Sequence, residues 1–136
     1  FYGTLRSEEV REAVIGQKKF NISRGILQKH KVYKVINANY PLIKFTNQKS
    51  DEVEGILITN LTAEEIKKLD KFEGKNYFRQ FVKINMKDKL YDAQIYMPQK
   101  TLIAEEPWNF DYWYKNNIND FFSKEFNLNG VKEIKS

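Results

Sequence analysis

One segment of the chain carries signals for both ends of a helix. Thr62 and Glu65 have the spacing of a capping box, in which each side chain bonds the backbone N–H of the other residue. Gly74 stands where such a helix would end, because glycine readily adopts the backbone geometry that follows a last turn. The sequence therefore predicts a helix that is fixed at both ends. The apolar residues expected to face the core are Ile66, Leu69 and Phe72.

Glu73 is the last residue of this predicted helix. A carboxylate there lies near the negative end of the helix dipole, which disfavours its ionised form. Partial burial would also raise its pKa and make it a better proton acceptor near neutral pH. The alternative is a solvated carboxylate with no chemical role, which is the usual state of a glutamate at a helix end.

The composition limits the classes of site and partner. The chain has 136 residues, enough for a single domain over residues 1–136, and 41% of them are hydrophobic. Cysteine is absent, which excludes disulfides, thiolate nucleophiles and cysteine metal sites. The one histidine, His30, lies between lysines and is expected at the surface. The net charge of +5 is spread along the chain, so it predicts a solvated surface and no nucleic-acid partner.

Neither a membrane span nor a leader is expected. No apolar run approaches the roughly 20 residues that cross a bilayer, and no signal peptide is visible, so we expect a soluble, cytoplasmic protein with no membrane partner. The first residues, Phe1-Tyr2-Gly3, read as the end of a strand. We therefore expect that further residues precede Phe1.

The remaining patterns predict an α+β domain. Ser7 is a good N-cap for a short helix over residues 8–15, and a longer helix with an aromatic stripe is predicted over 109–126. The aromatic stripe is typical of packing and not of a cofactor site. Segment 53–59 is apolar on both faces, which predicts a central strand. The other predicted strands are 20–35, 41–43, 77–86 and 90–97. We expect a mixed sheet that curls toward a barrel, although the pattern alone does not separate a barrel from an open sheet.

Two local patterns supply candidate binding groups. A strand–turn–helix unit with Gly3 in its turn exposes backbone N–H groups that can bind a carboxylate or a phosphate, and the alternative is an ordinary connection. Tyr77 and Arg79 lie two residues apart on one predicted strand, so they share a face. For Arg79 the alternative is a structural ion pair, with Asp70 as a candidate partner.

Five short blocks, taken in order, resemble the γ-glutamylcyclotransferase-like superfamily, which includes AIG2-like proteins and γ-glutamylamine cyclotransferases. The blocks are Phe1-Tyr2-Gly3-Thr4-Leu5-Arg6, Tyr40-Pro41-Leu42, Val53-Glu54-Gly55-Ile56-Leu57, Leu69-Asp70-Lys71-Phe72-Glu73-Gly74 with Tyr77 and Arg79, and Ala93 to Tyr96. Each block is short, and their order along residues 1 to 97 is what makes the resemblance specific. After Met97 the resemblance is limited to a tryptophan near Trp108 or Trp113.

The resemblance implies a small mixed β-barrel flanked by helices, with a cavity at one end. It implies that the loop formed by Tyr2, Gly3, Thr4 and Leu5 holds a glutamyl group and that Glu73 is the general acid/base. Tyr77 and Arg79 are the further candidates for substrate binding, and Tyr96 is an additional candidate for the cavity wall. The implied reaction releases 5-oxoproline and an amine or amino acid from a γ-glutamyl compound, with neither cofactor nor metal.

A second hypothesis comes from a different functional class. The same fold can serve as a small-molecule-binding or regulatory domain without turnover, because a fold does not determine a function. The presence of both Glu73 and the Tyr2–Leu5 loop favours the enzyme. The leaving group of the substrate and the oligomeric state stay open.

Overall fold

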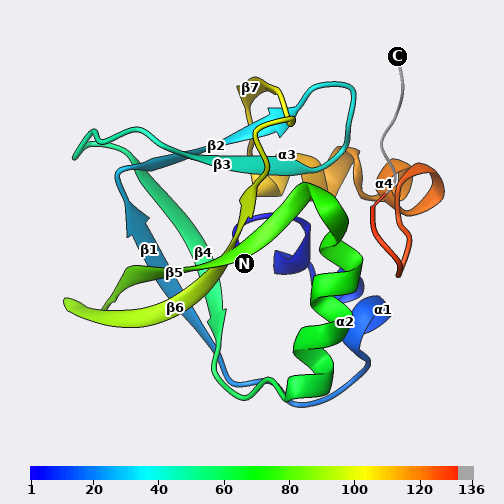
Figure 1. The fold of residues 1–136 in the computed structure, drawn as a ribbon, viewed down its shortest axis with the longest axis horizontal. Helices are drawn as coiled ribbons and strands as arrows, with labels where there is room; N and C mark the ends of the chain where they lie inside the picture. The colour runs from blue at the N-terminus through cyan, green and yellow to red at the C-terminus, as the bar shows by residue number, and fades with distance from the viewer. Residues whose placement is uncertain (132–136) are drawn as a thin grey trace.

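The strands form two separate antiparallel sheets. The computed structural model describes residues 1–131, so residues 132–136 of the predicted domain lie outside the described part. One sheet has the strand order β4-β1-β5-β6 and the other has the order β3-β2-β7. The strands are β1 (Ile22–Gln28), β2 (His30–Val35), β3 (Pro41–Phe45), β4 (Glu52–Ile58), β5 (Tyr77–Met86), β6 (Lys89–Pro98) and β7 (Ala104–Pro107). In Figure 1 the four-stranded sheet lies on the left and the three-stranded sheet crosses the top.

The helices gather on one side of the two sheets (Figure 1). They are η1 (Thr4–Arg6), α1 (Glu8–Ile15), α2 (Ala63–Glu73), η2 (Gly74–Asn76), α3 (Phe110–Asn116) and α4 (Ile118–Lys124), where η denotes a 3-10 turn. Helix α1 begins as predicted, because the Ser7 side chain accepts a hydrogen bond from the Val10 N–H. Helix α2 has both reciprocal bonds of the predicted capping box. It ends at Gly74, whose φ of 70° is left-handed.

The main core joins the helices to the three-stranded sheet. Phe72 of α2 packs against Phe121 of α4, and their ring centroids are 6.4 Å apart. Trp113 of α3 packs on the same Phe121 ring at 5.7 Å. These three side chains are almost completely buried. The predicted aromatic stripe is therefore part of the core, where it packs α3 and α4 against α2.

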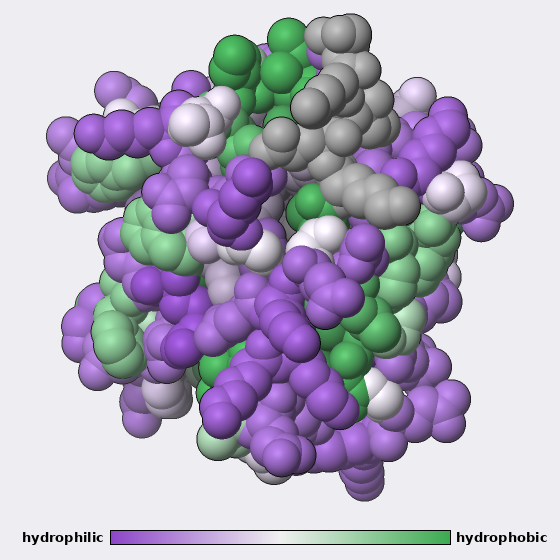
Figure 2. Space-filling view, turned by 45° about the vertical axis from the view of Figure 1, so that its right-hand side comes forward, coloured by the Kyte–Doolittle hydropathy of each residue, from purple (hydrophilic) through white to green (hydrophobic). Residues whose placement is uncertain are grey.

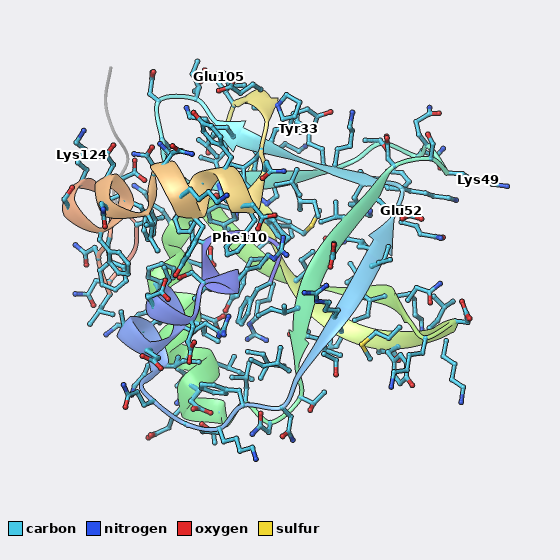
Figure 3. The ribbon with its side chains drawn as sticks, turned by 180° about the vertical axis from the view of Figure 1, so that it is seen from behind. Tyr33, Lys49, Glu52, Glu105, Phe110 and Lys124 are labelled. Carbon is cyan, nitrogen blue, oxygen red and sulfur yellow. The ribbon has the colours of Figure 1, made fainter. Side chains whose placement is uncertain are left out.

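The polar surface surrounds smaller apolar areas. Figure 2 shows polar side chains over most of the face that it presents, with apolar patches between them. Charged and polar side chains also project from the ends of the strands in Figure 3, where Lys49 lies in the turn before β4 and Glu52 is the first residue of that strand. His30 is partly exposed, and its Nδ1 lies 2.7 Å from the Gln28 carbonyl oxygen. His30 is therefore not part of the hydrophobic core.

The α+β class is confirmed, but several details of the predicted fold are wrong. The sheets are antiparallel and not mixed, and they are not closed, so the term barrel applies only loosely. The predicted strand 20–35 is a hairpin of β1 and β2, because Lys29 turns the chain with a φ of 64°. The predicted central strand 53–59 lies at the end of its sheet as β4. The outer side of β4 is covered by the first residue, since the Phe1 nitrogen donates to the Ile56 carbonyl and the Ile56 N–H donates to the Phe1 carbonyl.

The predicted helix 109–126 is two helices. It breaks at Asn117, which ends α3 by donating its N–H to the Trp113 carbonyl and then begins α4. The sequence reading also missed β7, a short strand that pairs with β2.

Candidate functional site

The predicted site residues come together around one cavity. Its volume is about 380 Å³, and its walls come from the N-terminal segment, β4, α2, β5 and β6. Tyr96 lines it, and so do all seven residues predicted for the site. These are Tyr2, Gly3, Thr4, Leu5, Glu73, Tyr77 and Arg79. The first residues lie in the middle of the molecule, between the four-stranded sheet and α2 (Figure 1), and there they line the cavity.

Glu73 is the last residue of α2 and lines this cavity. Burial raises its pKa to about 8, the Phe1 amino group opposes that rise, and the Asp70 carboxylate adds to it. Among residues 1–131 no hydrogen bond to the Glu73 carboxyl group is seen. A carboxyl group in this setting is neutral at low pH and can take or give a proton close to neutral pH.

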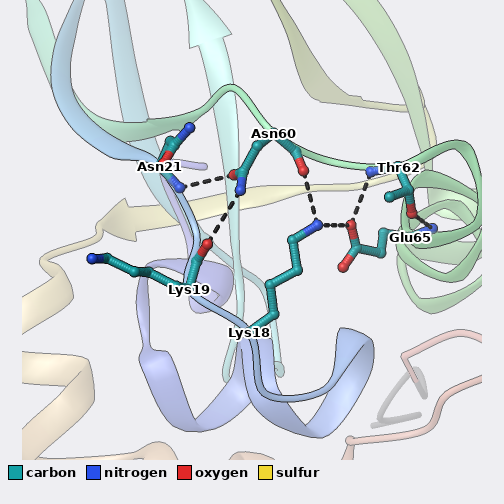
Figure 4. A network of polar contacts seen from close by, with 6 residues as sticks. All are labelled: Lys18, Lys19, Asn21, Asn60, Thr62 and Glu65. Atoms are coloured by element: carbon teal, nitrogen blue, oxygen red, sulfur yellow. Dashed lines mark hydrogen bonds and ion pairs between the residues drawn. The ribbon is translucent and has the colours of Figure 1, made fainter.

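The helix that carries Glu73 is held at its opposite end by a polar network (Figure 4). The Thr62 N–H donates to the Glu65 Oε1, and the Lys18 ammonium donates to the same oxygen at 2.8 Å. Lys18 also donates to the Asn60 carbonyl oxygen. The carboxylate of Glu65 therefore ties the start of α2 to the loop that follows α1.

The loop that precedes α1 is packed from two sides. Arg11 of α1 is buried, and its guanidinium donates to the carbonyl oxygens of Leu5 and Arg6 at 3.0 and 2.7 Å. On the other side, a Cβ on Gly3 would lie 2.8 Å from the Pro41 Cγ, so Gly3 permits an approach that a side chain would block. The backbone N–H groups of Thr4 and Leu5 belong to the first turn of η1, where a helix offers them no internal acceptor.

A second polar cluster lies on the wall formed by α2, β5 and β6. The Arg79 guanidinium donates to both oxygens of Asp70, at 2.8 and 3.1 Å, which is a bidentate ion pair. The Tyr96 hydroxyl donates to the Asp70 Oδ1 at 2.6 Å, and Arg79 Nη1 donates to the Gln94 side-chain oxygen. The ion pair between Arg79 and Asp70 is thus confirmed. Arg79 lines the cavity with its guanidinium already bonded to neighbouring side chains.

Tyr2 and Tyr77, the two tyrosines predicted for the site, are buried and also have protein partners. The Tyr77 hydroxyl donates to the Pro41 carbonyl oxygen, and the Tyr2 hydroxyl donates to the Tyr96 carbonyl oxygen, both at 2.7 Å. Burial raises the pKa of both phenols well above the usual value, with the Glu73 charge as a further cause. Both tyrosines therefore line the cavity with hydroxyl groups that are already bonded to backbone carbonyl oxygens.

Sequence reasoning missed part of the wall. The apolar side is built by β4 and the start of α2, with Ile56, Leu57, Ile58, Leu61 and Ile66. The signal was present in the apolar run after Gly55, but that run was interpreted as a strand with both faces buried in a sheet. Gln94 was missed as well, because a glutamine on a hairpin strand gives no distinguishing pattern.

No candidate metal site is found in the described part of the chain. Residues 1–131 contain no group of three or more His, Cys, Asp or Glu side chains arranged to hold a metal ion. Over the same residues, no helix is both long enough and apolar enough to span a bilayer.

Comparisons with known proteins agree on the family and the fold. A search of curated proteins finds no match at the significance required. Two solution structures from Arabidopsis thaliana, At5g39720.1 and At3g28950.1, are similar in fold, each with a TM-score of 0.64. Their sequences are 23% and 22% identical to this chain. Each match covers 90% of this chain, and the matches cover 83% and 75% of the two Arabidopsis chains. The family model described as gamma-glutamyl cyclotransferase, AIG2-like, matches residues 1–110. The chain therefore belongs to the AIG2-like gamma-glutamyl cyclotransferase family.

Proposed function

We propose that this protein releases 5-oxoproline from a γ-glutamyl compound, with Glu73 as the general acid/base. The observation that carries the proposal is a carboxyl group with a pKa of about 8 in the wall of a cavity of about 380 Å³. The volume is in the range of small-molecule sites, and the Tyr2–Leu5 loop lines the same cavity. Membership of the family supports a cyclotransferase-type function.

The reaction needs one proton acceptor that later becomes a donor. The α-amino nitrogen of the glutamyl group attacks its own γ-carbonyl carbon and forms a C–N bond that closes the five-membered ring. The Glu73 carboxylate accepts a proton from that nitrogen. The bond between the γ-carbon and the leaving nitrogen then breaks, and Glu73 returns the proton to the departing amine. The carboxyl group ends in its starting state, so no other proton carrier is required.

The Tyr2–Leu5 loop, which lines the same cavity as Glu73, positions the glutamyl group. The N–H groups of Thr4 and Leu5 are suited to a carboxylate or to the oxyanion that develops on the γ-carbonyl oxygen. Ring closure is intramolecular, so a cavity wall that holds the glutamyl chain folded lowers the activation barrier. For good orientation this effect is on the order of 7–11 kcal/mol. Arg79 has a different role in this proposal from direct substrate binding. Its bidentate contact neutralises Asp70, whose charge would otherwise raise the pKa of Glu73 further.

The test is release of 5-oxoproline from a panel of γ-glutamyl amines and γ-glutamyl dipeptides, measured by mass spectrometry. Glu73→Gln is expected to lower kcat/KM by at least about a hundredfold, because it removes the proton carrier but keeps the shape. For the unchanged protein, kcat/KM is expected to rise with pH and to level off above about pH 8, since the ionised form of Glu73 starts the reaction.

The control is Glu64→Gln, which changes an exposed carboxylate in the first turn of the same helix. It is expected to keep the full rate. If Glu73→Gln also kept the full rate, the assigned role of Glu73 would be wrong. Binding of 5-oxoproline without turnover on any member of the panel would favour the alternative, a small-molecule-binding domain on the same fold.

A further inference from the structure

One carboxylate outside the cavity is buried without a role in the chemistry above. Glu125 follows the last residue of α4 and has no solvent-exposed surface. The end of a helix disfavours a negative charge, and burial raises the pKa of Glu125 to about 7 while hydrogen bonds from Asn39 oppose that rise. A carboxyl group in such a place is costly unless its oxygens have good donors.

Among residues 1–131, every hydrogen bond to the Glu125 side chain comes from one residue, Asn39. The Asn39 backbone N–H lies 2.8 and 3.0 Å from the two carboxyl oxygens, and the Asn39 side-chain amide donates to one of them at 3.0 Å. The Trp113 indole N–H donates to the Asn39 carbonyl oxygen at 2.6 Å. We refer to Glu125, Asn39 and Trp113 as the Asn39 clamp. Two of its members lie beyond residue 110, where the family model ends.

The clamp holds the residue that leads directly into the cavity wall. Tyr40 and Pro41 follow Asn39 and line the cavity. The Pro41 carbonyl oxygen accepts the hydrogen bond of Tyr77, and the Pro41 ring is the group that Gly3 approaches. The rings of Tyr40 and Tyr77 also pack edge to face, with centroids 6.4 Å apart. A shift of Asn39 would therefore move a wall segment that contacts both the Gly3 loop and Tyr77.

We propose that Glu125 is a positioning residue, which acts through Asn39 to hold Tyr40 and Pro41 against the substrate loop. The inference rests on the proposed function, because it assigns the Tyr40–Pro41 wall to substrate binding. It adds that the two C-terminal helices take part in forming the site although neither of them lines the cavity. Proton transfer by Glu73 does not depend on this contact. The clamp therefore affects binding of the substrate more than the chemical step.

The experiment compares KM and kcat for Glu125→Gln with those of the unchanged protein. The amide keeps the shape but places an N–H₂ group against one of the Asn39 donors, which breaks part of the clamp. KM is expected to rise on the order of tenfold, while kcat stays within about twofold, because the loss is in positioning the bound glutamyl group. Asn39→Ala, which removes only the side-chain donor, is expected to raise KM in the same direction by a smaller factor.

The matched control is Phe122→Leu, which weakens the packing of α4 on the main core at a residue that is not a member of the clamp. It is expected to lower the melting temperature and to leave KM unchanged. An equal rise of KM in this control, or no rise in Glu125→Gln, would overturn the proposal.

A second readout separates this inference from the proposed function. If the unchanged protein turned over no γ-glutamyl compound, the function would fail, and the clamp would be judged by amide hydrogen exchange alone. Glu125→Gln is then expected to speed exchange at residues 3–5, 40 and 42–44 at least severalfold, and Phe122→Leu is not. Equal exchange in the two variants would contradict the clamp.

Discussion

At the scale of the residue, the fold makes Glu73 a different acid from an ordinary glutamate. An unfolded chain gives a glutamate a pKa of about 4.3, whereas burial in the cavity wall raises the pKa of Glu73 to about 8. Sequence reasoning predicted the direction from the position at the end of a helix and from an expected partial burial, without the contacts that cause the burial. The larger cause is burial by β4, β5 and the N-terminal segment, and that cause depends on contacts that no local pattern reveals.

This shift has a consequence for stability. Between about pH 4.3 and pH 8 the unfolded chain has lost the proton of Glu73 and the folded protein keeps it. The free energy of unfolding therefore falls as pH rises through that window. Glu73→Gln carries no such penalty, so the variant is expected to match the unchanged protein at pH 4 and to exceed it by up to about 5 kcal/mol at pH 8.5. Urea unfolding at the two pH values measures the difference. A gap that is the same at both would contradict the raised pKa, and Glu64→Gln, at an exposed site, supplies the control.

At the scale of the element, prediction succeeded where the signal is local. Helix α2 begins and ends where its capping box and Gly74 indicate, because those contacts are made within the segment itself. The break between α3 and α4 at Asn117 was not predicted, since the aromatic spacing continues across it and neither glycine nor proline marks it. Strand β7 exists through its pairing with β2, a partner about 70 residues away in sequence, so its own residues carry no strand pattern.

The capping box offers a test at this scale. Thr62→Ala removes the acceptor for the Glu65 N–H and is expected to lower the free energy of unfolding by about 1 kcal/mol. Because Glu73 lies at the other end of α2, the rate of 5-oxoproline release is expected to stay within about twofold. Lys67→Ala, an exposed change in the middle of the same helix, serves as the control for stability. A loss no larger than in this control would mean that tertiary contacts, and not the cap, hold the start of α2.

At the scale of the whole molecule, the site exists because distant segments meet. The chain begins beside β4, and the cavity lies between that first segment, α2 and the β5–β6 hairpin. The seven residues that the ordered motifs predicted for the site all line the cavity. The position of β4 at the end of its sheet could not be predicted, because its apolar residues pack around the cavity and its outer edge bonds Phe1, and neither contact leaves a local pattern in the sequence.

A pair of glycines tests this arrangement. Gly55 of β4 and Gly25 of β1 face each other in the sheet register. A Cβ on Gly55 would lie 2.5 Å from the Phe1 carbonyl oxygen, whereas a Cβ on Gly25 would lie 3.2 Å from the end of the Ile84 side chain. The backbone of Phe1 cannot move without losing both of its hydrogen bonds to Ile56, but a side-chain end can turn aside.

Gly55→Ala is therefore expected to cost about 2 kcal/mol more stability than Gly25→Ala, in the range reported for overpacking. It is also expected to lower kcat/KM at least about tenfold, because the displaced Phe1 carries Tyr2 and the Gly3 loop away from Glu73. Denaturant unfolding and 5-oxoproline release measure the two effects on the same pair of variants. Equal losses of stability and of kcat/KM in Gly25→Ala would contradict this prediction. They would mean that a side chain at either glycine disturbs the β1–β4 pair, and that the contact of Gly55 with Phe1 has no special effect.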